Sequence, residues 1–218
     1  MKMKRFGLVV CAALVFGGSA MSAQALDVRE DVDPGERAYV LALESRLDGA
    51  GPQEIARLSA ADRALLTKYA RVAAVTESYA VERLDSADPR VSGLVSGTAT
   101  TAVTSCYTAT STRVATGIAG NVLYKSWHVG SWCKSGSTVT SASRAEQGWQ
   151  TFWLGWSGRG LIGGSAAVIS NQGRSYSQHS FVFQLGTPSP TQYTQPCTRI
   201  RGTATPGYYA DFVCGLYS

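Results

Sequence analysis

Apolar residues recur at the spacing of an α-helix in the segment that follows Asp33. Asp33 can cap a helix whose first position is Pro34. The apolar residues on one face of this helix are Tyr39, Val40, Leu43 and Leu47. A short helix over residues 52–58 and a further helix that begins at Ser59 complete a helical hairpin. The apolar stripe of the last helix consists of Leu65, Leu66, Tyr69, Val72 and Ala73.

Beyond residue 90 the pattern becomes that of β-strands separated by glycine-containing turns. Phe181, Phe183 and Leu185 alternate with Val182 and Gln184, as in a strand with one buried face. The predicted strands cover residues 100–110, 122–133, 138–144, 150–156, 166–170, 175–185, 193–202 and 208–214. The expected fold class is α+β, with the helical hairpin followed by an antiparallel β-sandwich-like or barrel-like domain.

The segment over residues 1–25 has the pattern of a secretory signal peptide. Three basic residues precede an apolar run over residues 6–16, and Ala23-Gln24-Ala25 provides a cleavage site. This run is much shorter than the roughly 20 residues that a membrane-spanning helix needs. We therefore expect no membrane span and a mature protein that is secreted and extracellular.

Charge divides the mature chain into two parts. Residues 26–90 carry 13 acidic and 9 basic side chains, whereas residues 91–218 carry 2 acidic and 8 basic ones. We therefore divide the chain into a signal peptide (1–25), a helical segment (26–90) and a β-domain (91–218). Because the two mature parts have opposite charge, the helical segment is expected to dock on the β-domain as a lid or a cleaved pro-region.

All four cysteines of the mature chain lie in the β-domain: Cys106, Cys133, Cys197 and Cys214. An even number of cysteines in an exported chain predicts two disulfides. Three pairings are open, and we favour Cys106–Cys133 with Cys197–Cys214 because these close the shortest loops. The cysteines are widely spaced and include no Cys-x-x-Cys pair, which does not favour a metal site. No cofactor is expected.

Five tryptophans in one small β-domain suggest contact with sugars: Trp127, Trp132, Trp149, Trp153 and Trp156. If residues 149–156 form a strand, Trp149 and Trp153 share one face about 13 Å apart, within reach of one oligosaccharide. These two residues are the candidate binding platform. The alternative interpretation is that all five indoles pack in the core.

Basic side chains of the β-domain supply candidate accessory contacts. Arg199 and Arg201 lie on one face of a predicted strand and can meet acidic groups of a partner. The basic residues are scattered and form no aromatic–basic stripe, so nucleic acid is not an expected partner. A solvated surface is the alternative interpretation. The sequence Thr187-Pro188-Ser189-Pro190 is a candidate stiff loop of the kind that protease inhibitors present.

The sequence contains no catalytic signature. A hydrolase would need His128 or His179 as its base, because these are the only histidines. Residues 155–159 depart from a nucleophile elbow at two positions. Glu146 and Asp211, the only carboxylates of the β-domain, would form a glycosidase pair only if the fold joined them; Asp211 could equally complete a serine–histidine–aspartate set. We assign no catalytic residue and expect a binding protein rather than an enzyme.

The stretch from Leu123 to Cys133 contains Trp-His and Trp-Cys pairs, and Gly136-Ser137-Thr138-Val139-Thr140-Ser141 and Arg144 follow it. This pattern resembles that of short secreted β-domain proteins of actinobacteria, over residues 100–214. The resemblance implies export, a β-domain and disulfides, and it carries no catalytic residue. The expected function is binding of an extracellular carbohydrate or cell-envelope polymer; the alternative is interaction with an extracellular protein, as in a protease inhibitor.

Overall fold

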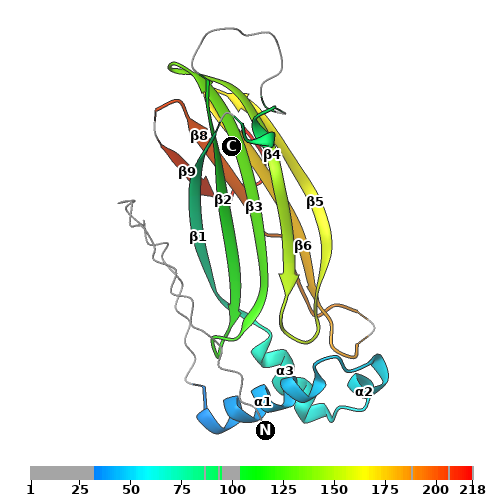
Figure 1. Cartoon of the computed structure of the whole chain (residues 1–218). Helices are drawn as coiled ribbons and strands as arrows, with labels where there is room; N and C mark the ends of the chain where they lie inside the picture. The colour runs from blue at the N-terminus through cyan, green and yellow to red at the C-terminus, as the bar shows by residue number, and fades with distance from the viewer. Residues whose placement is uncertain are drawn as a thin grey trace, which may run out of the picture.

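The computed structural model describes residues 32–85, 87–92, 94, 104–187, 189–205 and 207–217. Two antiparallel sheets pack face to face along the length of the molecule, and three helices lie at one end (Figure 1). Sheet A has the strand order β1-β2-β3-β4, and sheet B has the order β5-β6-β8-β9 with β7 beside β6. The expected antiparallel sandwich is confirmed, although the fold is mainly β rather than α+β.

Sheet A consists of β1 (Val72–Leu84), β2 (Thr104–Gly117), β3 (Val122–Ser135) and β4 (Thr138–Thr151). Sheet B consists of β5 (Trp156–Ile169), β6 (Gln172–Phe183), β7 (Gln192–Thr194), β8 (Cys197–Thr203) and β9 (Tyr208–Asp211). The β5–β6 turn places Ser170 and Asn171 at φ of 50° and 57°, as a type I′ hairpin turn requires. The Asn171 amide then donates to the Ser137 carbonyl at 2.9 Å, which ties this turn to the β3–β4 turn.

The helices are α1 (Pro34–Leu47), α2 (Pro52–Ala56), α3 (Ala60–Tyr69) and the short α4 (Pro89–Ser92). Both N-caps take the expected form. The Asp33 carboxylate accepts from the Glu36 amide at 2.7 Å, and the Ser59 hydroxyl accepts from the Asp62 amide at 3.0 Å.

Helices and sheets share one apolar core at the helical end of the sandwich. Val40, Leu66 and Tyr69 of the helices belong to the same buried cluster as the sheet residues Tyr124, Trp156, Phe181 and Phe183. The Trp156 indole also donates to the Ala70 carbonyl at 3.1 Å. A second cluster, at the far end, consists of Ala109, Trp132, Val139, Ile200 and Ala204.

The helical prediction for residues 26–90 is wrong beyond Tyr69. Residues 72–84 form β1, which pairs with β2 from Val72 opposite Gly117 to Leu84 opposite Cys106. The chain therefore changes from helix to strand at Ala70–Val72, and β1 is part of sheet A. Residues 1–31, which include the predicted signal peptide, lie outside the described residues.

The predicted strand over residues 150–156 is also absent. β4 ends at Thr151 and residues 152–155 turn into β5. The turn places Gly155 at φ 86°, a conformation that favours glycine.

Two disulfides join Cys106 to Cys133 and Cys197 to Cys214, which confirms the favoured pairing. The first links opposed residues of β2 and β3, and the second attaches the C-terminal segment to β8. Among the described helices, none is long and apolar enough to cross a membrane.

Candidate functional site

The structure separates the two tryptophans of the predicted platform. Trp149 lies near the end of β4 with 41% of its surface exposed, and its ring centroid is 6.0 Å from that of His179. Trp153 is 4% exposed and belongs to the core cluster at the helical end. Because residues 152–155 form a turn, the alternation that would align the two indoles is lost. Trp153 therefore cannot offer its ring to a ligand.

Arg199 and Arg201 are engaged in holding the C-terminal segment. The fully buried Arg199 guanidinium donates from Nε and Nη2 to the two carboxylate oxygens of Asp211, at 2.8 Å each. Arg201 pairs with the same carboxylate at 2.9 Å. Such a bidentate pair fixes geometry as well as charge. Arg199 is therefore a structural residue here and not an accessory contact at the surface.

Both histidines lie between the sheets, in a polar layer that separates the two apolar clusters. We define the polar layer by its buried members Ser111, Ser126, His128, Ser175, Ser177 and His179. His128 Nε2 lies 2.9 Å from Ser175 Oγ, across the two sheets. Burial lowers the pKa of His128 to about 4 and also lowers the pKa of His179.

The polar layer does not have the geometry of a hydrolase site. His128 is 0% exposed and Ser175 2%, so a substrate cannot reach the pair. Within the described part of the chain, His128 Nδ1 has no hydrogen-bond partner, so no carboxylate orients the ring. The two carboxylates considered for catalysis have separate partners: Asp211 binds Arg199, and Glu146 accepts from the Trp127 indole on another sheet.

The outer face of sheet A carries an aromatic ring that packs against the backbone of β4. Trp127, Val129 and Ser131 of β3 face outward, because the residues between them, among them His128 and Gly130, face sheet B. Trp127 stands opposite Gly148 of β4, and its six-membered ring occupies the space that a side chain at 148 would need. The indole, which is half-buried, therefore rests directly on the β4 backbone.

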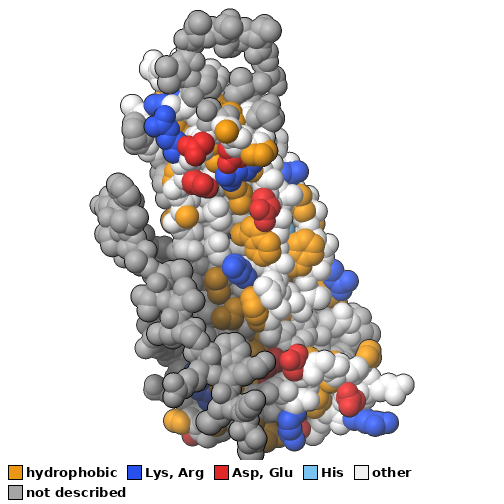
Figure 2. Space-filling view, in the orientation of Figure 1, with side chains coloured by type: hydrophobic (Ala, Val, Ile, Leu, Met, Phe, Trp, Pro, Cys, Tyr) orange, Lys and Arg blue, Asp and Glu red, His pale blue; other side chains and the backbone are white. Residues whose placement is uncertain are grey.

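A groove opens at Glu146, the hydrogen-bond acceptor of this indole. It has a volume of about 330 Å³, with Arg90 and Leu94 on one wall. The sheet residues that line it are Val129, Ser131, Ser143, Ala145 and Glu146. We call it the outer groove. Figure 2 looks onto this face of sheet A and shows acidic, basic and hydrophobic side chains gathered in its upper half.

Charged groups of the outer groove have defined partners. Arg90 binds Asp88 through Nη2 at 2.6 Å and also lies 3.6 Å from Glu82. The guanidinium holds the pKa of Asp88 at about 2. Glu146 Oε1 accepts from the Trp127 Nε1–H at 3.1 Å. The Lys125 ammonium lies over the same indole, 5.7 Å from its ring centroid.

Sequence reasoning counted Trp127 among five tryptophans without selecting it. The sequence feature that could have identified Trp127 is the alternation along β3. In this strand Trp127 and Val129 share one face, and Ser126 and His128 share the other. Ordinary patterning would have placed the aromatic face inside and the serine and histidine face outside. This strand reverses that order, because its inner face contributes to the polar layer.

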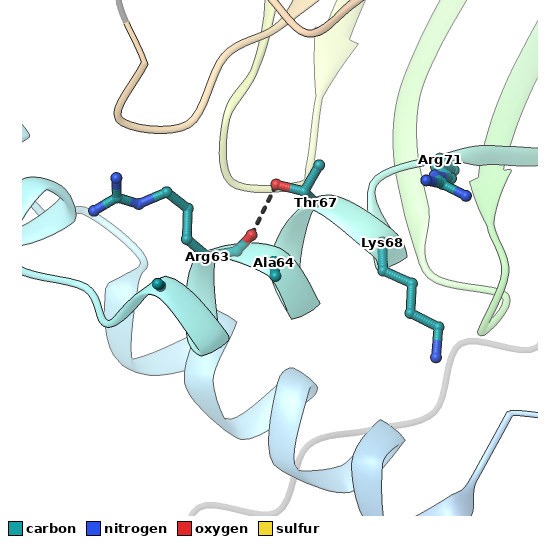
Figure 3. A pocket seen from close by; sticks show the side chains of 6 residues that line it. Arg63, Ala64, Thr67, Lys68 and Arg71 are labelled. Atoms are coloured by element: carbon teal, nitrogen blue, oxygen red, sulfur yellow. Dashed lines mark hydrogen bonds between the residues drawn. The ribbon is translucent and has the colours of Figure 1, made fainter.

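A second hollow, of about 400 Å³, lies along α3 and is bordered by Arg63, Lys68 and Arg71. Their side chains point in different directions, and Thr67 donates to the Arg63 carbonyl at 2.7 Å (Figure 3). Lys68 pairs with Glu36 at 2.6 Å, and Arg63 donates to the Leu58 carbonyl at 3.1 Å. These three cations therefore do not converge on one point where an anion could bind.

The proline-containing loop considered for protease inhibition connects β6 to β7. The Gln184 amide donates to the Thr187 carbonyl at 2.6 Å, and the Thr187 hydroxyl donates to the Ser189 carbonyl at 2.7 Å. Pro188 lies outside the described residues. The described part of this loop is thus braced by its own side chains.

No family model matches the chain, and no curated protein or solved structure matches it. The outer groove combines the Ser143 hydroxyl with the Glu146 carboxylate, which accepts from the half-buried Trp127 indole. Its volume falls in the range of about 300–1,000 Å³ that is usual for small-ligand sites.

Proposed function

We propose that this chain is a secreted, non-catalytic binding protein whose outer groove takes an extracellular carbohydrate or cell-envelope polymer. The observation that carries the proposal is the half-buried Trp127 indole, which packs against Gly148 and donates to Glu146, a residue that lines the groove. The apolar C–H face of a sugar ring stacks on such an indole. Trp127 thus takes the place that the sequence pattern assigned to Trp149 and Trp153.

The groove contains side chains that can form hydrogen bonds to a sugar. The Ser143 hydroxyl and the Glu146 carboxylate line the groove, whereas the Ser131 hydroxyl is buried and donates to Thr108. Hydroxyls both donate and accept, whereas an ionised carboxylate only accepts, so together they match the mixed hydroxyl groups of a sugar. Loss of any one of these groups should weaken binding less than loss of the indole.

The platform is held rigidly before a ligand arrives. Trp127 is fixed from below by the β4 backbone and at its Nε1–H by Glu146. Its strand, β3, is paired on both sides and linked to β2 by the Cys106–Cys133 disulfide. Little side-chain entropy is therefore lost on binding. Two disulfides and the leader-like pattern over residues 1–25 support the secreted part of the proposal.

The test is a binding screen of the secreted chain against cell-wall and storage polysaccharides, with two matched tryptophan variants. Trp127→Ala should weaken binding at least tenfold, whereas Trp149→Ala, which removes a more exposed indole from the same sheet, should leave it unchanged. Near-ultraviolet circular dichroism and the Tm of each variant control for folding. Equal binding by native protein and Trp127→Ala would overturn the proposal, as would a screen in which no polysaccharide binds.

A further inference from the structure

Carboxylates outnumber cations around the outer groove. Arg90 stands on its wall with Asp88 and Glu82 as ion-pair partners. Glu146 adds a third carboxylate, and it makes no ion pair with any described residue. Lys125, whose ammonium lies over the Trp127 indole, is a second cation near the groove, so three carboxylates stand against two cations.

The guanidinium of Arg90 is already hydrogen-bonded to Asp88. Its Nε and Nη2 donate to both oxygens of Asp88, at distances between 2.6 and 3.1 Å. An anionic ligand would have to compete with this local pair, and it would also approach the unpaired carboxylate of Glu146. Because like charges repel across a site of this size, acidic polymers are disfavoured.

The Trp127 indole already has a cation over its ring in this protein. The Lys125 ammonium lies over its ring at 5.7 Å, which is the usual range for a cation–π contact. Lys125 has a flexible side chain, so a ligand can displace its ammonium from the ring at little cost. A sugar ring on the indole would then bring an ammonium group at the edge of that ring beside Glu146, which accepts from the indole N–H there.

From these contacts we infer that the outer groove selects polysaccharides with free amines, of the glucosamine class, over acidic and fully N-acetylated ones. The inference rests on the proposed function and names the class of glycan that the groove takes. A protonated amino sugar satisfies the indole face through its ring and Glu146 through its ammonium. N-acetylation removes that charge, and a uronate or phosphate reverses it.

The test compares three probes by isothermal titration calorimetry: a glucosamine hexamer, an N-acetylglucosamine hexamer and a galacturonate hexamer. At pH 6 and low salt the glucosamine hexamer should bind roughly tenfold more tightly than its acetylated counterpart, and the galacturonate hexamer should bind most weakly. The preference should shrink at high salt.

Glu146→Gln isolates the charge, because its amide oxygen still accepts from the Trp127 indole. This variant should lose most of its preference for the glucosamine hexamer, because the carboxylate charge is gone and only the attraction of the indole for a cation remains. Glu54→Gln, which keeps an acceptor for the Gly51 amide at the opposite end of the molecule, should retain the native preference.

The outcomes distinguish the two proposals. Equal binding of the three probes by native protein would overturn the amine preference and leave the proposed function standing. Tightest binding of the galacturonate hexamer, or an unchanged preference in Glu146→Gln, would also overturn it. If no probe binds and no polysaccharide of the wider screen binds, the proposed function fails and the inference fails with it.

Discussion

At the scale of single residues, the missing side chain of Gly148 determines how Trp127 lies. A Cβ at this position would collide with the six-membered ring of the indole. The backbone of Gly148 does not need positive φ, so the glycine is required by the ring and not by the strand. The same relation holds between Gly158 and Trp149, which provides a natural control.

Gly148→Ala should therefore lift the Trp127 indole from the sheet and weaken glycan binding at least tenfold. The loss of unfolding free energy should remain about 1–3 kcal/mol, because the ring can move toward solvent. Gly158→Ala should displace Trp149 in the same way and leave binding unchanged. Calorimetric binding and urea denaturation of both variants measure the two effects, and similar losses of affinity in both would contradict the assignment of Trp127.

At the scale of elements, the helix caps could be predicted from the sequence, whereas the pairing of the strands could not. The caps at Asp33 and Ser59 involve residues three positions apart, so the sequence alone identified both helix starts. β1 was missed because Val72 and Ala73 continue the apolar spacing of α3, while the pairing that makes them a strand comes from β2, which is distant in the sequence. In β3 the alternation was visible, but which face was inside depended on the polar layer.

The α3 cap gives a prediction at this scale. Ser59→Ala should lower the free energy of unfolding by about 1 kcal/mol, because the Asp62 amide loses its acceptor. Leu66 and Tyr69 of α3 belong to the core shared with the sheets, so the effect should appear in the main unfolding transition. Thermal denaturation checks this against Ser59→Asp, which keeps a capping oxygen and should retain native stability.

At the scale of the whole molecule, the polar layer makes the sandwich sensitive to acid. His128 and His179 are buried and uncharged, and the nearby Arg144 further lowers the pKa of each. Between the ordinary histidine pKa of about 6.5 and the folded value of about 4 for His128, the unfolded chain binds more protons than the folded one. Stability must therefore decrease as the pH falls through this range.

Urea denaturation at pH 7.0 and pH 5.0 should show a loss on the order of 2 kcal/mol at the lower pH. Burial also raises the pKa of Glu77, which lies beside Arg113. Near its pKa this carboxyl binds more protons in the folded chain than in the unfolded chain, so at those pH values it offsets part of the loss of stability that the histidines cause. The window between pH 5 and 6.5 therefore reports mainly on the histidines. His128→Asn should flatten the pH dependence, and equal slopes in native protein and variant would contradict the role of the polar layer.

The most direct test of the central claim follows the five tryptophan indole N–H signals by NMR while a binding oligosaccharide is added. With the signals assigned by single Trp→Phe variants, Trp127 should show the largest shift, because its Nε1–H bonds to Glu146 at the edge of the outer groove. The buried indoles of Trp132, Trp153 and Trp156 should stay in place. A titration that moves Trp149 and leaves Trp127 unchanged would contradict the outer groove as the binding site.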